Sequence, residues 1–462
     1  MKNKNQSPQL DLFKPFHEIF HELCLIIFDL LKELFKFAFG KVFNLKAPEH
    51  KIERRALAVK KQTQLEDALG IDTRTKREVN LKSIDFKKHS FIVGASGFGK
   101  TNLITILQEH SLRENKPIIF FDPKGDYESL MTFQALCKKY KKPCYIFSEH
   151  YKDSISLNPV LDGTANQVTN RIMECFTWTE PHYETMCKSA LRKALNQIKA
   201  DDRVFTLKTI LDYLKQSSSK DIVGLIEKLE DIVGSDFGRI LNAETDGLTF
   251  SKVRAERACL YVGLSTQGYG ETARALGRLF LGELMNQSYT SLNSEKGKYE
   301  AELNPVSIYF DEFGSIVTKE FIELQNKCRG GGIELTVAVQ AAADINKICP
   351  DLMNQIIENS GNYFVLKQRL DEAATFFANA IGTIVTKKET HMIEDGEVQK
   401  KGSVRDVNEL IAHPDIIKNL AVGQCILLTQ DPVSYKLINI RNRKMTDVTK
   451  YNRLVNNQNF QT

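Results

Sequence analysis

The sequence predicts an α/β fold with a mostly parallel central sheet that helices cover on both faces. Two observations indicate it: short β-branched and aromatic runs alternate with helical stretches, and the first such run leads into a glycine loop and a helix start. Because the runs are continuously apolar, both faces of each strand should be buried. The expected strands are Ser90–Gly94, Pro117–Asp122, Cys144–Phe147, Ala258–Leu264, Val306–Asp311, Glu334–Val339, Asn362–Lys367, Gln424–Thr429 and Lys436–Arg441.

The first long apolar stretch, from Phe16 to Phe43, predicts an amphipathic helix. Its longest apolar run, Leu23–Phe28, is only six residues and is bounded by Glu22 and Asp29, so it is too short to cross a bilayer. We expect neither a transmembrane segment nor a secretion signal. The pattern HExxH at 17–21 fits the polar face of this helix, and no zinc site is predicted.

A chain of 462 residues can hold two or three domains. Strand patterns stop over 165–242, where helical spacing predicts an all-α domain inserted in the α/β domain. The expected division is an amphipathic helical segment at 1–48, a basic linker at 49–80, the α/β domain at 81–164 and 243–445, the insertion at 165–242, and a polar tail at 446–462.

Composition is that of a globular protein, with 42% hydrophobic and 26% charged residues. The net charge of +5 allows a nucleic acid or an acidic membrane as partner but does not by itself indicate either. The nine cysteines form no CxxC pair, which is typical of reduced, buried thiols in a cytoplasmic protein.

The glycine loop GASGFGKT matches the phosphate-binding pattern G-x-x-x-x-G-K-[ST] in full. It follows an expected strand and opens an expected helix, which is the context that the pattern requires. Lys100 would reach the β- and γ-phosphates of ATP, and Thr101 would place its hydroxyl on Mg²⁺. The expected nucleotide-binding residues are Gly94, Ala95, Ser96, Gly97, Phe98, Gly99, Lys100, Thr101 and Asn102.

Two acids end the strand expected at 306–311. Asp311 would hold Mg²⁺ through its water shell, and Glu312 would orient and deprotonate the attacking water. Paired acids at a strand end are an ordinary surface turn in most proteins, so this interpretation depends on the phosphate loop.

Two further residues could couple hydrolysis to movement. Gln340 ends the next strand, where it could sense the γ-phosphate or simply start a loop. Arg329 precedes three glycines and could be an arginine finger that reaches a neighbour's ATP, or a solvated loop charge.

In these motifs the sequence resembles the type IV coupling proteins, the TraD/TraG class of conjugation ATPases related to the FtsK and HerA motors. The matching stretches within 80–445 are FFDPKGDYE, SLNPV, YVGLSTQGYGETARALGRLFLGEL, IYFDEFG, RGGGIELTVAVQAAADI and NLAVGQCILL. The resemblance implies a RecA-like nucleotide-binding domain with an all-α insertion, assembly as a homohexamer around a pore, and delivery of relaxase–DNA complexes to a type IV secretion channel. Asp122 and Lys124 mark the family, but their role stays open.

Two features depart from the family pattern. Members usually carry N-terminal transmembrane helices, whereas residues 16–43 predict at most peripheral contact with the cytoplasmic face of the inner membrane. Phe98 stands where the family usually has Ser, and we expect altered packing rather than lost ATP binding.

The sequence therefore predicts a cytoplasmic hexameric ATPase and DNA translocase that acts as a coupling protein. The absence of a groove-reading motif predicts that DNA is bound through its phosphates. The alternatives are an FtsK/HerA-type translocase without a secretion role, a coupling ATPase for protein effectors, and a docking adaptor that does not hydrolyse ATP.

Overall fold

The computed structural model describes residues 66–243, 247–346, 350–394 and 397–442. The predicted N-terminal helix and polar tail lie outside these residues. All the described elements belong to one compact unit.

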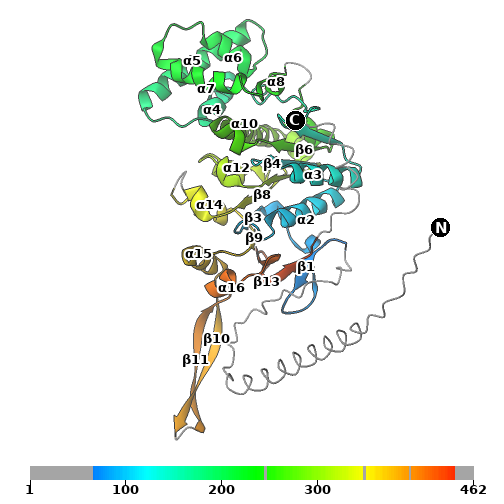
Figure 1. Cartoon of the computed structure of the whole chain (residues 1–462), viewed down its shortest axis with the longest axis vertical. Helices are drawn as coiled ribbons and strands as arrows, with labels where there is room; N and C mark the ends of the chain where they lie inside the picture. The colour runs from blue at the N-terminus through cyan, green and yellow to red at the C-terminus, as the bar shows by residue number, and fades with distance from the viewer. Residues whose placement is uncertain (1–65, 244–246, 347–349, 395–396, 443–462) are drawn as a thin grey trace, which may run out of the picture. The chain divides into compact units, whose positions relative to one another are not determined.

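An eleven-stranded sheet forms the centre of this unit, in the order β2-β1-β13-β12-β9-β3-β8-β7-β4-β6-β5 (Figure 1). The seven strands from β9 to β5 are parallel, and the four from β12 to β2 continue the sheet in antiparallel pairing. Every strand that the sequence predicts is present. The strands are β1 Ala68–Asp72, β2 Glu78–Asn80, β3 Ser90–Val93, β4 Ile118–Asp122, β5 Cys144–Phe147, β6 Cys259–Gly263, β7 Val306–Phe310, β8 Ile333–Val339, β9 Asn362–Val365, β12 Gln424–Gln430 and β13 Val433–Ile440.

Helices cover both faces of the sheet, as the continuous apolar strands require. Successive residues of β3 point to opposite sides: Phe91 and Val93 join one core cluster and Ile92 joins the other. The face of Ile92 is covered by α2 Lys100–Arg113 and α3 Tyr127–Lys139. Helices that contribute to the other cluster include α4 Ala165–Glu174, α5 Pro181–Ala200, α6 Leu207–Leu214, α7 Val223–Val233, α8 Gly238–Leu241, α9 Phe250–Ala255, α10 Thr266–Leu292, α12 Phe321–Cys328, α13 Ala342–Asn346, α14 Leu352–Glu358, α15 Asp371–Ile381 and α16 Pro414–Lys418. The remaining helical elements are α11 Glu295–Leu303 and the 3-10 turns η1 Leu81–Ser83, η2 Phe86–Lys88, η3 Lys220–Ile222 and η4 Phe313–Ser315.

The stretch predicted to be all-helical carries α4 to α8 (Figure 1). It shares a core with the sheet, because Phe237 of this stretch stacks on Phe147 of β5 with ring centroids 6.0 Å apart. Phe280 of α10 meets the same Phe147 edge to face at 5.2 Å. Phe237, at the start of α8, is therefore packed onto the sheet, and the standing of α4 to α8 as a separate domain remains a prediction.

The basic linker predicted over 49–80 is wrong at its C-terminal end, because β1 and β2 lie there. The five residues of β1 are nearly all buried, although Gly70 and Asp72 make the segment resemble a loop in sequence. Gly70 is needed for close approach, since a Cβ at this position would lie 2.0 Å from the carbonyl oxygen of Asn439 in β13. The sheet therefore begins before the expected domain boundary at residue 81.

A hairpin that the sequence analysis missed forms a sheet of its own. It consists of β10 Thr383–Glu394 and β11 Glu397–Leu410, paired antiparallel (Figure 1). Charged residues such as Lys387 and Arg405 interrupt its apolar pattern, and both are exposed. At 383–388 and 403–410, where the structure describes its side chains, the ribbon is exposed or half-buried, so these stretches give neither the continuous nor the alternating apolar pattern of other strands.

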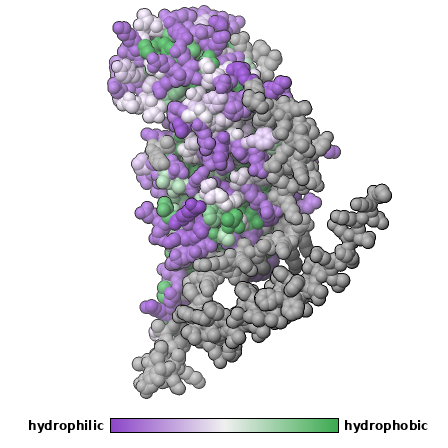
Figure 2. All heavy atoms as spheres, viewed as in Figure 1, coloured by the Kyte–Doolittle hydropathy of each residue, from purple (hydrophilic) through white to green (hydrophobic). Residues whose placement is uncertain are grey.

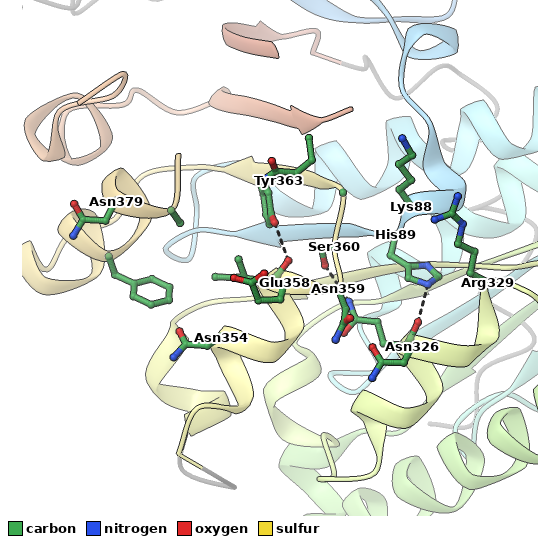
Figure 3. A pocket seen from close by; sticks show the side chains of 16 residues that line it. Lys88, His89, Asn326, Arg329, Asn354, Glu358, Asn359, Ser360, Tyr363 and Asn379 are labelled. Carbon is green, nitrogen blue, oxygen red and sulfur yellow. Dashed lines mark hydrogen bonds between the residues drawn. The ribbon is translucent and has the colours of Figure 1, made fainter. Parts of the chain in front are cut away.

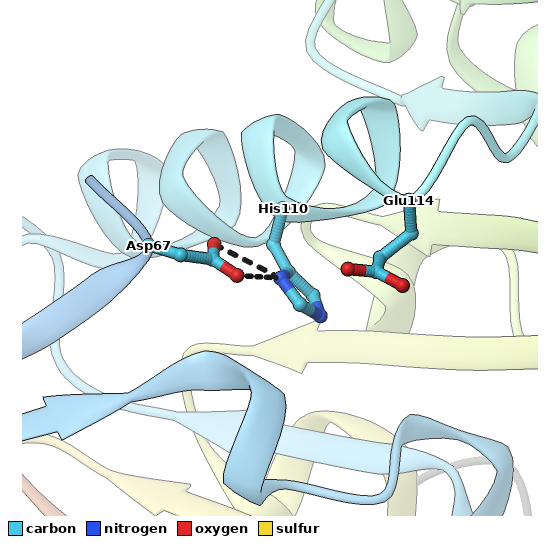
Figure 4. A group of neighbouring side chains, drawn as sticks. All are labelled: Asp67, His110 and Glu114. Carbon is cyan, nitrogen blue, oxygen red and sulfur yellow. Dashed lines mark hydrogen bonds and ion pairs between the residues drawn. The ribbon is translucent and has the colours of Figure 1, made fainter. Parts of the chain in front are cut away.

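A buried pair connects the residue before β1 to α2. Both carboxylate oxygens of Asp67 lie within 3.0 Å of Nδ1 of His110 (Figure 4). Arg113 forms an ion pair with the same carboxylate, with its Nη1 3.5 Å from Oδ1 of Asp67. The pair fixes the start of the sheet against the helix that follows the glycine loop.

The described residues contain no helix that is long and apolar enough to cross a membrane. One face of the molecule is mostly hydrophilic, with scattered apolar side chains (Figure 2). The cysteines of the described ranges, Cys137, Cys144, Cys175, Cys187, Cys259, Cys328 and Cys425, are all free, as the absence of CxxC pairs predicts.

His89 connects the start of β3 to its neighbours. Its Nε2 donates to the carbonyl of Gln325 in α12 at 3.0 Å, and its Nδ1 accepts the N–H of Leu335 in β8 at 3.1 Å. This pattern requires the neutral ring, and burial lowers the pKa of His89 from 6.5 to about 4. Since the folded-state pKa is depressed, its contribution to stability is complete above pH 6.5 and is lost as pH falls toward 4.

We predict that His89→Gln weakens the dependence of stability on acid pH. The difference between 6.5 and about 4 corresponds to about 3 kcal/mol of unfolding free energy in the wild type. Urea unfolding between pH 7.5 and pH 4.5 measures it. The variant should start less stable at pH 7.5, and its curve should converge on the wild-type curve as the pH falls. Parallel curves would contradict this account.

Candidate functional site

The glycine loop leaves the carboxyl end of β3 and enters α2 at Lys100. Gly97 and Gly99 have φ values of 82° and 101°, which residues with a side chain rarely adopt. The N–H of Ala95 donates to the carbonyl of Lys367 at 3.0 Å, which ties the loop to the end of β9. The loop is thereby held in an open turn with Ser96 and Gly97 exposed.

Lys100 lies at the bottom of this loop and is buried. Its Nζ donates to the carbonyl oxygen of Gly94 at 2.6 Å. Burial lowers the pKa of Lys100, while the negative charges of Asp311 and Glu312 oppose that shift. Next to it, the Thr101 side chain is exposed in the first turn of α2, where a hydroxyl is free to meet a ligand.

Asp311 follows β7, two strands away from β3 in the sheet. Its N–H donates to the carbonyl of Phe121 at 3.0 Å, so the neighbouring strand β4 fixes its backbone. The pKa of Asp311 is raised to about 6, mainly by burial and also by the charges of Asp122 and Glu312, against the effect of Lys100. These acids and one lysine therefore interact at one edge of the sheet.

Glu312 has a left-handed backbone, with φ of 46°. Non-glycine residues rarely adopt this conformation, which occurs in tight turns and at strained functional sites. Its N–H donates to Oδ1 of Asp311 at 3.0 Å, and its Oε1 accepts from Nε2 of Gln340 at 2.8 Å. The structure thus brings together Lys100, the adjacent pair Asp311 and Glu312, and Gln340, which come from three points of the sequence.

Arg329 lies elsewhere. It follows α12 and precedes β8, whereas Gln340 follows β8, so the seven residues of that strand separate them. That length corresponds to about 20 Å. The Arg329 side chain lines a cavity of about 750 Å³ at the amino end of the parallel strands, beside Lys88 and His89 (Figure 3). It is not part of the site formed around Lys100 in the same chain.

Phe98 packs against the core cluster on the α2 side of the sheet. Two cations from the segment after β9 lie over its ring: Nζ of Lys367 is 5.2 Å and Cζ of Arg369 is 5.8 Å from the ring centroid. Asn102 does not point freely into the loop, because its Nδ2 donates to the carbonyl of Arg441 at 3.0 Å.

Four residues near the site carry no role that the sequence alone predicts. Lys367 and Arg369 carried no motif, and only the position of β9 beside β3 brings them to the loop. Asp122 and Lys124 stood in the DPKGD stretch without a mechanism. The structure places Nζ of Lys124 at 4.0 Å from Oε1 of Glu312.

Two family models match the chain. One, described as the central domain of helicase HerA, matches residues 69–255, and the other, described as the TraM recognition site of TraD and TraG, matches residues 305–421. The resemblance to the TraD/TraG class and to HerA-related motors is therefore confirmed. No curated protein matches the sequence significantly.

Solved structures share the fold at low sequence identity. The bacterial conjugative coupling protein TrwBdeltaN70, in an unbound form, has a TM-score of 0.60 at 10% identity, over 83% of this chain and 90% of that one. Plasmid coupling protein TrwB in complex with ADP and Mg²⁺ gives 0.56 at 11%, over 84% and 92%. VirB4 of Thermoanaerobacter pseudethanolicus gives 0.56 at 14%, over 83% and 98%. These matches confirm the predicted RecA-like P-loop fold.

We predict that Phe98→Ser lowers stability but leaves nucleotide affinity within about threefold of the wild type. The ring packs on the core and under two cations, so its loss should cost about 2 kcal/mol. Phe98→Leu, which keeps apolar packing, is the matched control and should be intermediate in thermal unfolding. A Ser variant that folds but no longer binds ATP would show that Phe98 acts in binding.

Proposed function

We propose that this chain, which resembles the HerA motors over 69–255 and the TraD/TraG coupling proteins over 305–421, is a hexameric ATPase that couples DNA to a secretion channel. It would pump DNA, delivered with its relaxase, to a type IV secretion channel during conjugative transfer. One observation supports the proposal: the cluster of Lys100, Asp311, Glu312 and Gln340 beside the glycine loop occurs in the same chain as a match to the TraM recognition site of TraD and TraG.

The residues present fit ATP and Mg²⁺. Positive φ at Gly97 and Gly99 would let the loop turn its backbone N–H groups toward a phosphate, and the N-terminus of α2 adds positive potential there. Lys100 would exchange the Gly94 carbonyl for the β- and γ-phosphates. Thr101 and Asp311 would hold Mg²⁺, which neutralises phosphate charge when bound.

Glu312 and Gln340 supply the remaining groups. Glu312 would orient the attacking water and accept its proton, since a carboxylate is the general base that this edge offers. Gln340 donates to Oε1 of that carboxylate, so a change at either residue is passed to the other. Gln340 lies at the end of β8 and could carry the loss of γ-phosphate to the segment that follows.

The partners of this proposal follow from the resemblance and from charge. We propose that DNA binds through phosphates, with relaxosome proteins and channel components as protein partners. We propose a cytoplasmic location with peripheral contact at the inner face of the cytoplasmic membrane through residues 16–43.

A second candidate is a DNA translocase without a secretion role. The match of residues 69–255 to the central domain of helicase HerA favours it. Deleting the gene and scoring plasmid transfer separates the two candidates. A coupling protein is required for transfer and dispensable for growth, and restoration by the wild type but not by Lys100→Ala would link transfer to ATP. Unchanged transfer in the deletion strain would reject the coupling role.

We predict different defects for two changes at the hydrolysis site. Lys100→Ala should lower both ATP binding and hydrolysis, because it removes the positive charge that would contact the β- and γ-phosphates. Glu312→Gln should bind ATP with near wild-type affinity and hydrolyse it about 100-fold or more slowly, because the shape is kept and the base is lost. Fluorescent-nucleotide binding and phosphate release measure the two properties. Wild-type hydrolysis by Glu312→Gln would show that the base is assigned wrongly.

We predict that Arg329 acts on ATP held by a neighbouring subunit. It lies too far from Lys100 to serve its own site, and an arginine finger contributes roughly 10³–10⁵ in rate in phosphoryl transfer. Arg329→Ala and Glu312→Gln chains should each be inactive, and mixed rings should regain part of the activity at interfaces where both residues are intact. Arg329→Lys tests whether charge alone suffices. Demonstrably mixed rings without activity, or wild-type activity in Arg329→Ala, would contradict action in trans.

A further inference from the structure

The turn between β4 and α3 is organised by one buried carboxylate. Asp122 is 2% exposed, and its Oδ1 accepts the N–H groups of Lys124 at 3.0 Å and Gly125 at 3.2 Å. Its Oδ2 accepts the N–H of Asp126 at 3.2 Å and the hydroxyl of Tyr261 at 2.7 Å. The carboxylate thus serves the turn itself, because both oxygens are already engaged by neighbouring donors.

The turn is also fixed from the outside. Gly125 has φ of 64°, and a Cβ there would lie 2.5 Å from Oγ of Ser265. The N–H of Thr266 donates to the carbonyl of Pro123 at 2.7 Å. Asp126 caps α3 by accepting the N–H of Ser129 at 3.1 Å. The backbone of Lys124 is therefore held at one place at the carboxyl end of β4.

The side chain of Lys124 extends from this turn toward the hydrolysis site. Its Nζ lies 4.0 Å from Oε1 of Glu312, and 52% of the side chain is exposed. Glu312 already accepts a shorter hydrogen bond from Gln340, at 2.8 Å. An exposed ion pair at 4.0 Å contributes little to stability. The pair with Glu312 therefore does not explain why the turn that carries Lys124 is held by so many hydrogen bonds.

Lys124 and Lys100 both interact with Glu312: Nζ of Lys124 lies 4.0 Å from its Oε1, and its negative charge acts on the pKa of Lys100. The positive charge of Lys124 is one of the influences that lower the pKa of Lys100, after burial. Two ammonium groups at the same edge of the sheet, one at the glycine loop and one on the turn after β4, would both attract an anion that lay between them. In a site for ATP the group that extends beyond the glycine loop is the γ-phosphate.

We propose that Lys124 is a second phosphate-binding lysine, which contacts the γ-phosphate of ATP held in the same chain and so distinguishes ATP from ADP. Asp122 acts through Lys124 as a positioning residue. The proposal rests on the proposed function, since it assumes that the glycine loop binds ATP. It gives each part of the DPKGD stretch a role. Asp122 accepts the hydrogen bonds that hold the turn, Gly125 adopts its positive φ, and Lys124 contacts the γ-phosphate.

Binding of ADP and of a non-hydrolysable ATP analogue tests the proposal. Lys124→Ala should weaken the analogue about 10-fold and leave ADP within about twofold, because a charge-assisted contact is lost only where a γ-phosphate exists. Lys124→Arg should restore part of the preference. Lys87→Ala is the matched control, because it removes an exposed lysine just before the opposite end of β3. Asp122→Asn, which cannot accept all four hydrogen bonds, should show the same ATP-selective loss.

The nucleotide-binding measurements separate failure of this inference from failure of the proposed function. Unchanged affinity for both nucleotides in Lys124→Ala, together with loss of both in Lys100→Ala, overturns the inference and leaves the ATPase proposal standing. Equal weakening of ADP and the analogue also overturns it, because it indicates a general effect of the turn. A wild-type chain that binds neither nucleotide would reject the function itself.

Discussion

The arrangement at the candidate site depends on charges buried at the carboxyl edge of the parallel sheet. Burial lowers the pKa of Lys100 and raises the pKa values of Asp122 and Asp311, so each group is pushed toward its neutral form. Removing charges from water is costly unless they are paired or hydrogen-bonded. The sheet allows such pairing, because β3, β8, β7 and β4 are neighbours and end at the same edge, which brings the acids close to Lys100. A bound nucleotide and its cation would therefore meet charged groups that the fold already holds in place.

The rest of the fold supports that edge from both sides. The pair of Asp67 and His110 fixes α2 to the start of the sheet, while the stacked rings of Phe121 and Phe310, with centroids 4.7 Å apart, fix β4 against β7. These are the strands that end in Asp122 and precede Asp311. Arg329 precedes the opposite end of β8 and lies outside the site. Any role in hydrolysis would therefore require a second copy of the chain.

Much of this could be predicted from sequence, because the signals are local. Strands buried on both faces are continuous apolar runs, and a glycine loop between a strand and a helix has a fixed geometry. The meeting of Lys100, Glu312 and Gln340 followed from parallel strands whose carboxyl ends share an edge. The contacts of Asp122 with Tyr261 and of Phe98 with Lys367 could not be predicted, since they depend on strand order and on side-chain direction. β1 could not be predicted for a related reason: Gly70 resembles a break in the strand pattern, and its need for close approach depends on the pairing of β1 with β13.

The central claim, that this edge hydrolyses ATP to move DNA, is tested most directly by the ATPase rate of the full chain with and without DNA. The account predicts that DNA of two unrelated sequences raises the rate equally, and that the stimulation declines with rising salt because contact is to phosphates. A rate that DNA does not change, or stimulation by only one of the two sequences, would contradict it.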